Sequence, residues 1–435
     1  ARAARGKDPA AEKRRLMPAT PAMSGFQRTD FRLLFLVLFT VAAGNTALQS
    51  VLPAIGRELH IPDVFIAAIF SLSALAWTIS APFWARQSDQ RGRKKLIMLG
   101  MWGYFVSTLL CALVIFFGLE GWIGPVLIVS LFALFRALFG LFGSASSPAA
   151  QAYIAVRTTP RQRTAAISIL ASAFGLGTIV GPAVAPFFIF PEVELSGPLF
   201  MFTLFALVTL FLVWRFLPRD DAEEVARNAG RGARRLSWMD PRIRPFILYG
   251  LVVGNAQAAT GQTLGFFVID MSGRDPVAAQ YLIGVAMMAG AGATLLAQWG
   301  LIGIFRMGPK QLTRWGAGLA LAGTCGMAFS ASIHAIIVSF ALAMLGYGFA
   351  RPGFSAGASL SVGQEDQGAA AGTVTAVNGA NFIVAPTVGV ALYQFHQPLP
   401  YILSAVLLAI ILVYSLRSRL LSTDLADQGE VAMGR

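Results

Sequence analysis

Long apolar segments alternate with short polar ones along the chain, and a charged stretch over residues 218–244 divides them into two groups of six. Most reach or exceed the roughly 20 residues that a helix needs to cross about 30 Å of hydrocarbon. The predicted spans lie at about 31–55, 64–85, 95–118, 122–155, 163–190, 197–217, 245–271, 277–305, 311–332, 335–362, 368–393 and 398–416. The pattern predicts an all-α membrane protein with twelve transmembrane helices in two six-helix bundles.

The polar segments complete the predicted organisation. Residues 1–28 are basic and lack the apolar stretch of a signal peptide, so we expect a mobile cytoplasmic tail. An even number of spans returns the C-terminus to the same side of the membrane. The predicted parts are the N-terminal tail 1–28, the N-terminal bundle 29–217, the cytoplasmic linker 218–244, the C-terminal bundle 245–418 and the cytoplasmic C-terminal tail 419–435.

The two groups of spans repeat each other. A shift of 204 residues places Pro182 on Pro386, and a shift of 210 places Gly44-Asn45 on Gly254-Asn255. Parallel repeats, related by a pseudo-twofold axis along the membrane normal, are typical of transporters whose binding site lies between the halves near the bilayer midplane. Rocking one half against the other would expose that site to each side in turn.

Composition supports the membrane assignment. Hydrophobic residues make up 56% of the chain and charged ones 13%, whereas roughly a quarter of a soluble domain is charged. The net charge of +13 comes mainly from Lys and Arg in loops and tails on one predicted side, which indicates cytoplasmic termini and not nucleic-acid binding. Cys111 and Cys325 lie within apolar runs, so we expect no disulfide framework, no metal site and no cofactor.

The loop between the second and third spans, residues 84–96, is densely cationic. It contains Asp89, Arg91, Gly92 and Arg93 within five positions. Gly92 suits a tight reversal, because a residue without Cβ can adopt positive φ. From charge alone, the alternative is a loop that only fixes the orientation of the helices.

The order of these residues resembles the loop 2–3 signature of the major facilitator superfamily, G-x-x-x-D-R-x-G-R-[RK]. Ala85 and Gln90 replace the first Gly and the first Arg of that signature. In the family this loop is a latch that stabilises the outward-facing state through its Asp. The resemblance therefore implies a conformational latch formed by Asp89, Arg91, Gly92 and Arg93.

The fourth and fifth spans carry further motifs. Arg136, followed by Gly140, is expected near the middle of the bilayer, where an unpaired cation costs at least about 2.5–3.5 kcal/mol, so it must face a cavity or a partner. Gly177, Gly181 and Pro182 form G-x-x-x-G-P, which favours close helix packing and a bend. Arg136 resembles the family's fourth-helix Arg, tied to proton coupling, and G-x-x-x-G-P resembles the motif of its drug:proton antiporters. Pro386 is the counterpart of Pro182 in the second half.

Amide side chains recur at helical spacing within the predicted spans. Three pairs each lie on one helix face, and Arg351 adds a second cation at membrane depth. We expect the substrate cavity to be lined by Asn45, Gln49, Arg136, Asn255, Gln262, Arg351, Asn378 and Asn381. Such amides also hold helices together in membranes, at about 0.6–2 kcal/mol each, and the spacing alone leaves both roles open.

Carboxylates are absent from the predicted span interiors. All 21 Asp and Glu fall in loops, tails or helix ends, with Glu58 and Asp270 nearest to an interior. The expected cavity therefore has positive potential and favours anionic, zwitterionic or neutral amphiphilic solutes over lipophilic cations. If protons drive transport, Asp89, Asp270 or Glu58 must titrate, or the ionisation of the substrate itself provides the coupling.

The leading hypothesis is a secondary transporter that moves a small organic solute across a bacterial-type inner membrane by alternating access. Proton-coupled efflux is favoured over import or facilitated transport of an organic anion or metabolite, because the fifth-span motif is the one directional signal. A non-transporting membrane receptor stays open as a remote alternative. An enzyme is not expected, since Ser144, Ser146 and Ser147 have no His or acid at their depth. Expected partners are a small-molecule substrate, membrane lipid and protons, with the protein a monomer.

Overall fold

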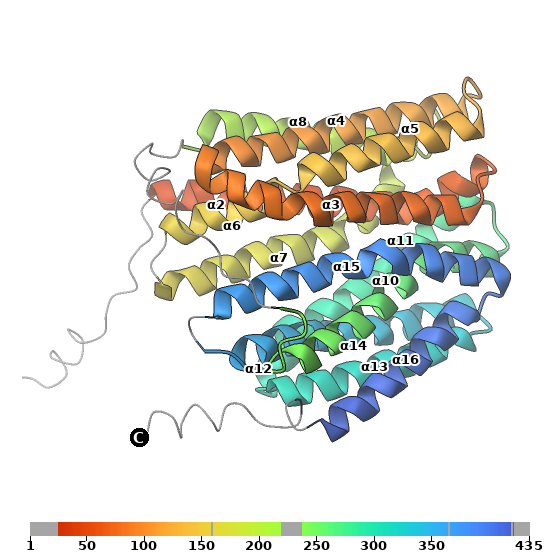
Figure 1. The fold of residues 1–435 in the computed structure, drawn as a ribbon. Coiled ribbons are helices and arrows are strands. Elements are labelled where there is room, and N and C mark those ends of the chain that lie inside the picture. The colour runs from red at the N-terminus through yellow and green to blue at the C-terminus, as the bar shows by residue number, and fades with distance from the viewer. Residues whose placement is uncertain (1–24, 158–159, 219–236, 364–365, 419–420, 422–435) are drawn as a thin grey trace, which may run out of the picture.

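The computed structural model describes residues 25–157, 160–218, 237–363, 366–418 and 421, which are almost entirely helical. The long helices lie side by side with their axes roughly aligned (Figure 1). The first half consists of α2 (Gly25–Glu58), α3 (Asp63–Arg91), α4 (Arg93–Leu119), α5 (Pro125–Leu138) with η1 (Phe139–Gly143) and α6 (Ser146–Arg157), α7 (Pro160–Val184) with η2 (Ala185–Phe188), and α8 (Gly197–Phe216). The second consists of α10 (Arg244–Ser272), α11 (Pro276–Leu295) with η3 (Leu296–Leu301) and α12 (Ile302–Ile304), α13 (Pro309–Ala328), α14 (Ile333–Leu360), α15 (Gln367–Phe395) and α16 (Leu399–Arg417).

Each of the twelve predicted spans corresponds to one of these helices or continuous helical stacks. Within the described ranges, nine helices are long and apolar enough to cross a bilayer, and Ser172–Phe188 is a shorter apolar segment in α7 and η2. The remaining two, α10 and α13, run alongside the others (Figure 1). The predicted fold class, an all-α membrane protein of twelve helices in two bundles, is confirmed.

The two ends of the helix array are named here by their connections. The linker face is the end at which α8 stops and α10 starts, and the distal face is the opposite end, which carries the turn at residues 59–62. At the linker face, α3 stops at Arg91 and α4 starts at Arg93. Gly92 between them has φ 94° and ψ 140°. The expected positive φ of this turn is confirmed, and it is a conformation that L side chains rarely adopt.

Glycines bring helix backbones together inside each half. A Cβ at Gly177 would lie 2.8 Å from the carbonyl oxygen of Phe39 in α2, and one at Gly181 would collide with the carbonyl oxygen of Ala43. In the second half, a Cβ at Gly316 of α13 would lie 2.7 Å from the backbone nitrogen of Ala350 in α14. Such contacts are typical of small-residue packing between membrane helices.

Side chains of the two halves meet toward the distal face. Ser71 of α3 and Thr387 of α15 have their hydroxyl oxygens 2.7 Å apart. Further along the same pair of helices, a Cβ at Gly379 would lie 2.9 Å from the hydroxyl of Thr78. Gly372 lies two turns closer to the linker face on the same side of α15, and a Cβ there would meet nothing within 4 Å. The two helices are therefore packed together distally and diverge toward the linker face.

Candidate functional site

Arg136 lies inside the first bundle. Its side chain is buried, and its Nη2 donates to Oδ1 of Asn45 in α2 at 2.8 Å. The guanidinium carbon lies 4.6 Å from the ring centroid of Phe139 and 5.5 Å from that of Phe70. No carboxylate among the described residues pairs with it. The aromatic faces and the Asn45 amide thus surround a cation that has no carboxylate neighbour in the part of the chain that the structure describes.

A cavity of about 10 Å³ adjoins Arg136, close to the smallest volume that can hold one water molecule. Its lining includes Tyr104 and Cys111 of α4 and Gly44 of α2. The hydroxyl of Tyr104 and the Nε of Arg136 are both buried without a hydrogen-bond partner. A Cβ at Gly44 would collide with that hydroxyl, so this glycine makes room for a polar group beside Arg136. The cavity is too small for an organic solute.

Four of the amides predicted to line a cavity form two pairs. Asn255 of α10 donates through Nδ2 to Oδ1 of Asn381 in α15 at 2.9 Å, and Asn381 donates to the carbonyl oxygen of Gly250 at 3.2 Å. These two therefore connect helices within the second half. Gln49 of α2 donates to Oε1 of Gln262 in α10 at 3.4 Å, which connects the two halves.

Asn378 is half-buried on α15 and has no partner among the described residues. Of the six predicted amides, it is the one that remains available to a solute in this conformation. The other five bond one another or Arg136, as expected for polar groups that hold membrane helices together, and the Nε2 of Gln262 is buried without a partner among the described residues.

Arg351 differs from Arg136 in its exposure. It lies on α14, between Gly348, which packs against Thr294 of α11, and Phe354, which packs against Gly250 of α10. Positions three residues apart lie on neighbouring parts of one helix face, so Arg351 points between α10 and α11. Its side chain is nevertheless exposed and pairs with no described carboxylate. The end of α14 at Leu360 lies nine residues further along the helix, so Arg351 lies about 13 Å inside the linker face.

A charged cluster closes the distal face across both halves. Arg57 of α2 binds Asp63 of α3 through Nε at 2.9 Å and Nη2 at 2.8 Å. Its Nη1 lies 3.2 Å from Oδ1 of Asp270 in α10, and the Tyr393 hydroxyl of α15 donates to Asp270 at 2.7 Å. The four residues line a hollow of about 630 Å³, together with His60. Asp270 was predicted as a functional residue, whereas Arg57, Asp63 and Tyr393 were missed.

The other predicted acids take different positions. Glu58 is exposed at the distal end of α2 and forms no ion pair with any described residue. The backbone of Asp89 belongs to α3, but its side chain lies outside what the structure describes. Arg91 is exposed, and Gly92 and Arg93 are buried beside it. The latch therefore stays a prediction.

The predicted packing residues lie at helix contacts. The Ser80 hydroxyl of α3 donates to the carbonyl oxygen of Gly140 at 3.0 Å, which anchors α3 to the π-helical turn η1. The carbonyl oxygen of Pro182 faces Gly284 of α11 across the two halves, where a Cβ would lie 3.1 Å away. Pro386 is buried in α15. Gly181 packs on α2 as described above.

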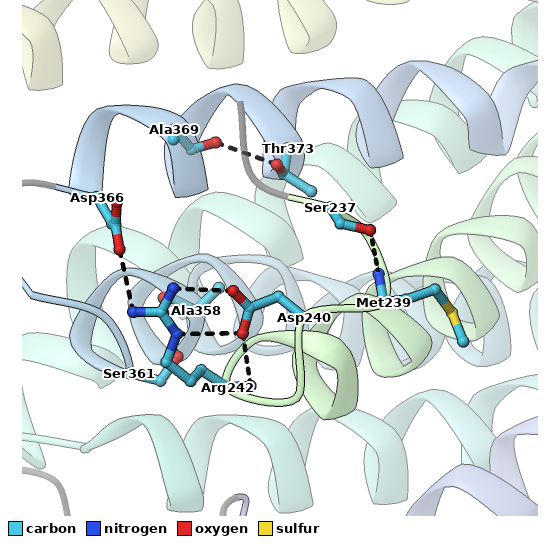
Figure 2. Close-up of polar contacts among 9 residues, drawn as sticks. All are labelled: Ser237, Met239, Asp240, Arg242, Ala358, Ser361, Asp366, Ala369 and Thr373. Atoms are coloured by element: carbon cyan, nitrogen blue, oxygen red, sulfur yellow. Dashed lines mark hydrogen bonds and ion pairs between the residues drawn. The ribbon is translucent and has the colours of Figure 1, made fainter. Parts of the chain in front are cut away.

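At the linker face, Arg242 ties the segment before α10 to the loop between α14 and α15. Figure 2 shows its guanidinium between two carboxylates. Nε and Nη2 bind Asp240 at 3.1 and 2.8 Å, and Nη1 binds Asp366 at 3.0 Å. The hydrogen bonds from Arg242 lower the pKa of Asp240 below its usual value. This cluster fixes the end of the linker to the second half.

Because the pKa of Asp240 is lower in the folded protein than in the unfolded chain, the stabilisation by this pair is fully present above the unfolded value of about 3.9. It is lost as the pH falls through the lower folded value. We expect Asp240→Asn to reduce thermal stability at neutral pH and the difference from the wild type to shrink in acid. Thermal unfolding of both proteins as a function of pH checks this. A constant difference down to the lowest pH would contradict it, and Arg242→Gln should reproduce the effect.

Comparison with known proteins identifies the family of this chain. The model of the Major Facilitator Superfamily matches residues 34–381. Multidrug resistance protein 2 of Bacillus subtilis (strain 168) is 30% identical over 161 residues, which span 37% of each chain. Tetracycline resistance protein, class B, of Escherichia coli is 23% identical over 383 residues, covering 85% of this chain and 89% of the relative.

Solved structures share the fold. A bacterial homologue of the human lysosomal transporter Spinster, in an inward-facing and occupied conformation, superimposes with a TM-score of 0.71 at 12% identity. The match covers 90% of this chain and 97% of that one. Since the family model spans most of the sequence and the helices adopt the same arrangement, the chain belongs to the major facilitator superfamily of membrane transporters.

Proposed function

We propose that the protein is a secondary transporter that exports a small organic solute by alternating access between its two bundles. The names of its relatives, multidrug and tetracycline resistance proteins, support export. The packing of α3 on α15 near the distal face and their divergence toward the linker face support an inward-facing conformation. In this proposal, residues 29–217 and 245–418 move as two bodies, and the linker face is cytoplasmic.

The substrate class rests on Arg351. This cation is exposed about 13 Å inside the linker face, between α10 and α11, and no described carboxylate neutralises it. A cation inside the helix bundle without a neighbouring carboxylate attracts a negative group, because the low-dielectric walls around it focus its field. Arg136 adds positive potential from inside the first bundle. We therefore propose an anionic, zwitterionic or neutral amphiphilic substrate, contacted by Arg351 and Asn378.

Protons are the proposed coupling ion. Of the predicted acids, Glu58 is exposed at the surface and Asp270 lies in the distal contact between the halves, so neither is required as the coupling group. The ionisation of an acidic substrate would provide coupling without any of them. In the same proposal the protein acts as a monomer in the inner membrane, with both termini in the cytoplasm.

The test is a ligand panel matched in size and hydrophobicity but differing in charge. Purified protein in lipid nanodiscs is heated with amphiphilic anions, zwitterions, neutral compounds and lipophilic cations. We expect the melting temperature to rise with members of the first three groups, because each ligand stabilises the state that it binds. Stabilisation by lipophilic cations alone would refute the proposed substrate class. Hits then enter proteoliposome transport assays with a pH indicator, where solute movement without proton flux would refute the coupling.

A further inference from the structure

The distal cluster has one guanidinium and two carboxylates. Arg57 and Asp63 belong to the first half and are six residues apart, joined by two hydrogen bonds of 2.8 and 2.9 Å. Asp270 belongs to the second half, and its contacts with Arg57 are longer, at 3.2 and 3.3 Å. When the halves separate, the pair within the first half can persist. The contact between Arg57 and Asp270 joins the two halves, so it must break when they separate.

Among the described residues, the charged and titratable groups around Asp270 come from four helices and one turn. Arg57 approaches from α2, Asp63 from α3, Tyr393 from α15 and Tyr401 from α16. His60 lines the same hollow from the turn between α2 and α3. With both carboxylates ionised the ion cluster carries a net charge of −1, and one added proton makes it neutral. Protonation on Asp270 removes the ion pair between the halves and leaves the one inside the first half.

Solvent reaches Asp270 from one side. The side chain of Asp270 is 21% exposed and that of Asp63 is 6% exposed, and the hollow of about 630 Å³ opens at the distal face. Below the hollow the halves are closed. Pro53 packs directly on Gly265, where a Cβ would lie 2.5 Å from its Cγ, and Gln49 is bonded to Gln262. A proton on Asp270 therefore exchanges with the distal compartment in this conformation.

We propose that Asp270 is a proton-binding site of the distal compartment that controls closure of the distal face, and that its proton is not carried across the membrane. The ionised carboxylate holds Arg57 and keeps the halves together. The protonated form releases Arg57 to Asp63, and the distal face opens. Acid outside would then favour the open state without entering the transport stoichiometry. This inference rests on the proposed alternating access.

The first experiment measures conformation without any substrate. Cys111 and Cys325 are replaced by Ala, and spin labels are placed at Glu58→Cys and Arg274→Cys, two exposed distal positions in different halves. Distances between the labels are measured at neutral and acidic pH. We expect acid to raise the long-distance population about fivefold, the size expected for a partly exposed ion pair. Asp270→Asn should show the acid-like population at neutral pH and no further response.

Two variants assign the response to one carboxylate. Asp63→Asn should keep the pH response, because Asp270 still pairs with Arg57. Glu120→Gln, which neutralises an exposed acid at the distal end of α4, should behave as the unmodified protein. A response retained in Asp270→Asn, lost in Asp63→Asn or absent from the parent protein would overturn the inference. These distances are informative even if no solute is transported.

The second experiment tests whether the proton is carried. Proton and solute fluxes are compared in proteoliposomes containing the wild type or Asp270→Asn. We expect the same number of protons per solute, with a changed dependence of rate on distal pH. A lower proton-to-solute ratio in Asp270→Asn would show a carried proton and overturn this part of the inference.

Discussion

Replacing Arg351 with Gln is expected to lower the affinity for an anionic solute by about 10- to 100-fold. A hydrogen bond to a charged group contributes about 1.5–3 kcal/mol, and more where water is excluded. Arg351 offers such a bond from an exposed position between α10 and α11, with no described carboxylate in contact. Binding by calorimetry or concentration-dependent thermal shift gives the affinity directly. Neutral analogues of the same solute should change by less than about threefold, since they do not use the charge.

Two variants distinguish the effect of the charge at Arg351 from the effect of the total charge of the protein. Arg274→Gln removes the same charge from an exposed distal position and should leave the affinity unchanged. Arg351→Lys keeps the charge but not the planar fork of donors, so it should recover part of the affinity. If Arg351→Gln weakened anionic and neutral solutes equally, Arg351 would act on the conformational equilibrium and not on substrate charge.

Replacing Gly181 with Ala is expected to destabilise the protein by about 1–3 kcal/mol, the usual cost of excess volume in a close-packed interior. The new methyl would collide with the carbonyl oxygen of Ala43 and lie 2.6 Å from the hydroxyl of Thr46. Both atoms belong to α2, and a backbone oxygen cannot move without its helix. We therefore expect a lower melting temperature and weaker packing of α7 on α2, measured by thermal unfolding in nanodiscs.

Gly292→Ala is the matched control for this substitution. Gly292 lies in the interior of α11, and a Cβ there meets nothing within 4 Å. The same methyl should then be neutral or stabilising by up to about 1 kcal/mol, through helix propensity. Equal losses in both variants would mean that the flexibility of glycine, and not the close approach of α7 to α2, determines the effect.

The sequence predicts the helices of this protein well, because each span must satisfy its own backbone hydrogen bonds in lipid and therefore contains a long apolar run. The twelve predicted segments match the observed helices to within a few residues, except at α2 and α3, which extend further toward the linker face. The turn at Gly92 is also predictable, since it depends on one local conformation.

Side-chain pairing across helices is not predictable in the same way. Asn255 and Asn381 are 126 residues apart, and their contact depends on the rotation of α10 and α15 about their axes. The same applies to Arg136, whose depth follows from its position in the span but whose partner, Asn45, lies on another helix. Helical spacing shows which residues share a face, but not what that face contacts.

One signal in the sequence points to the contact between Arg57 and Asp270 in the distal cluster. Arg57 and Asp270 are separated by 213 residues, and so are Gln49 and Gln262. The repeat offset between α2 and α10 is 210, so both contacts join residues one turn beyond equivalent positions in the two halves. A search for complementary residues near the repeat offset would therefore find pairs across the pseudo-twofold axis.

Polar side chains at the contact between the halves couple distal opening to hydration. Hydroxyls and amides such as Ser71 and Gln49 are among the groups that join the halves. When these polar groups part, each must acquire hydration, so distal opening takes up water from the surrounding solution. Osmolytes such as sucrose, which are excluded from protein surfaces, should therefore bias the population toward the dehydrated, distally sealed form.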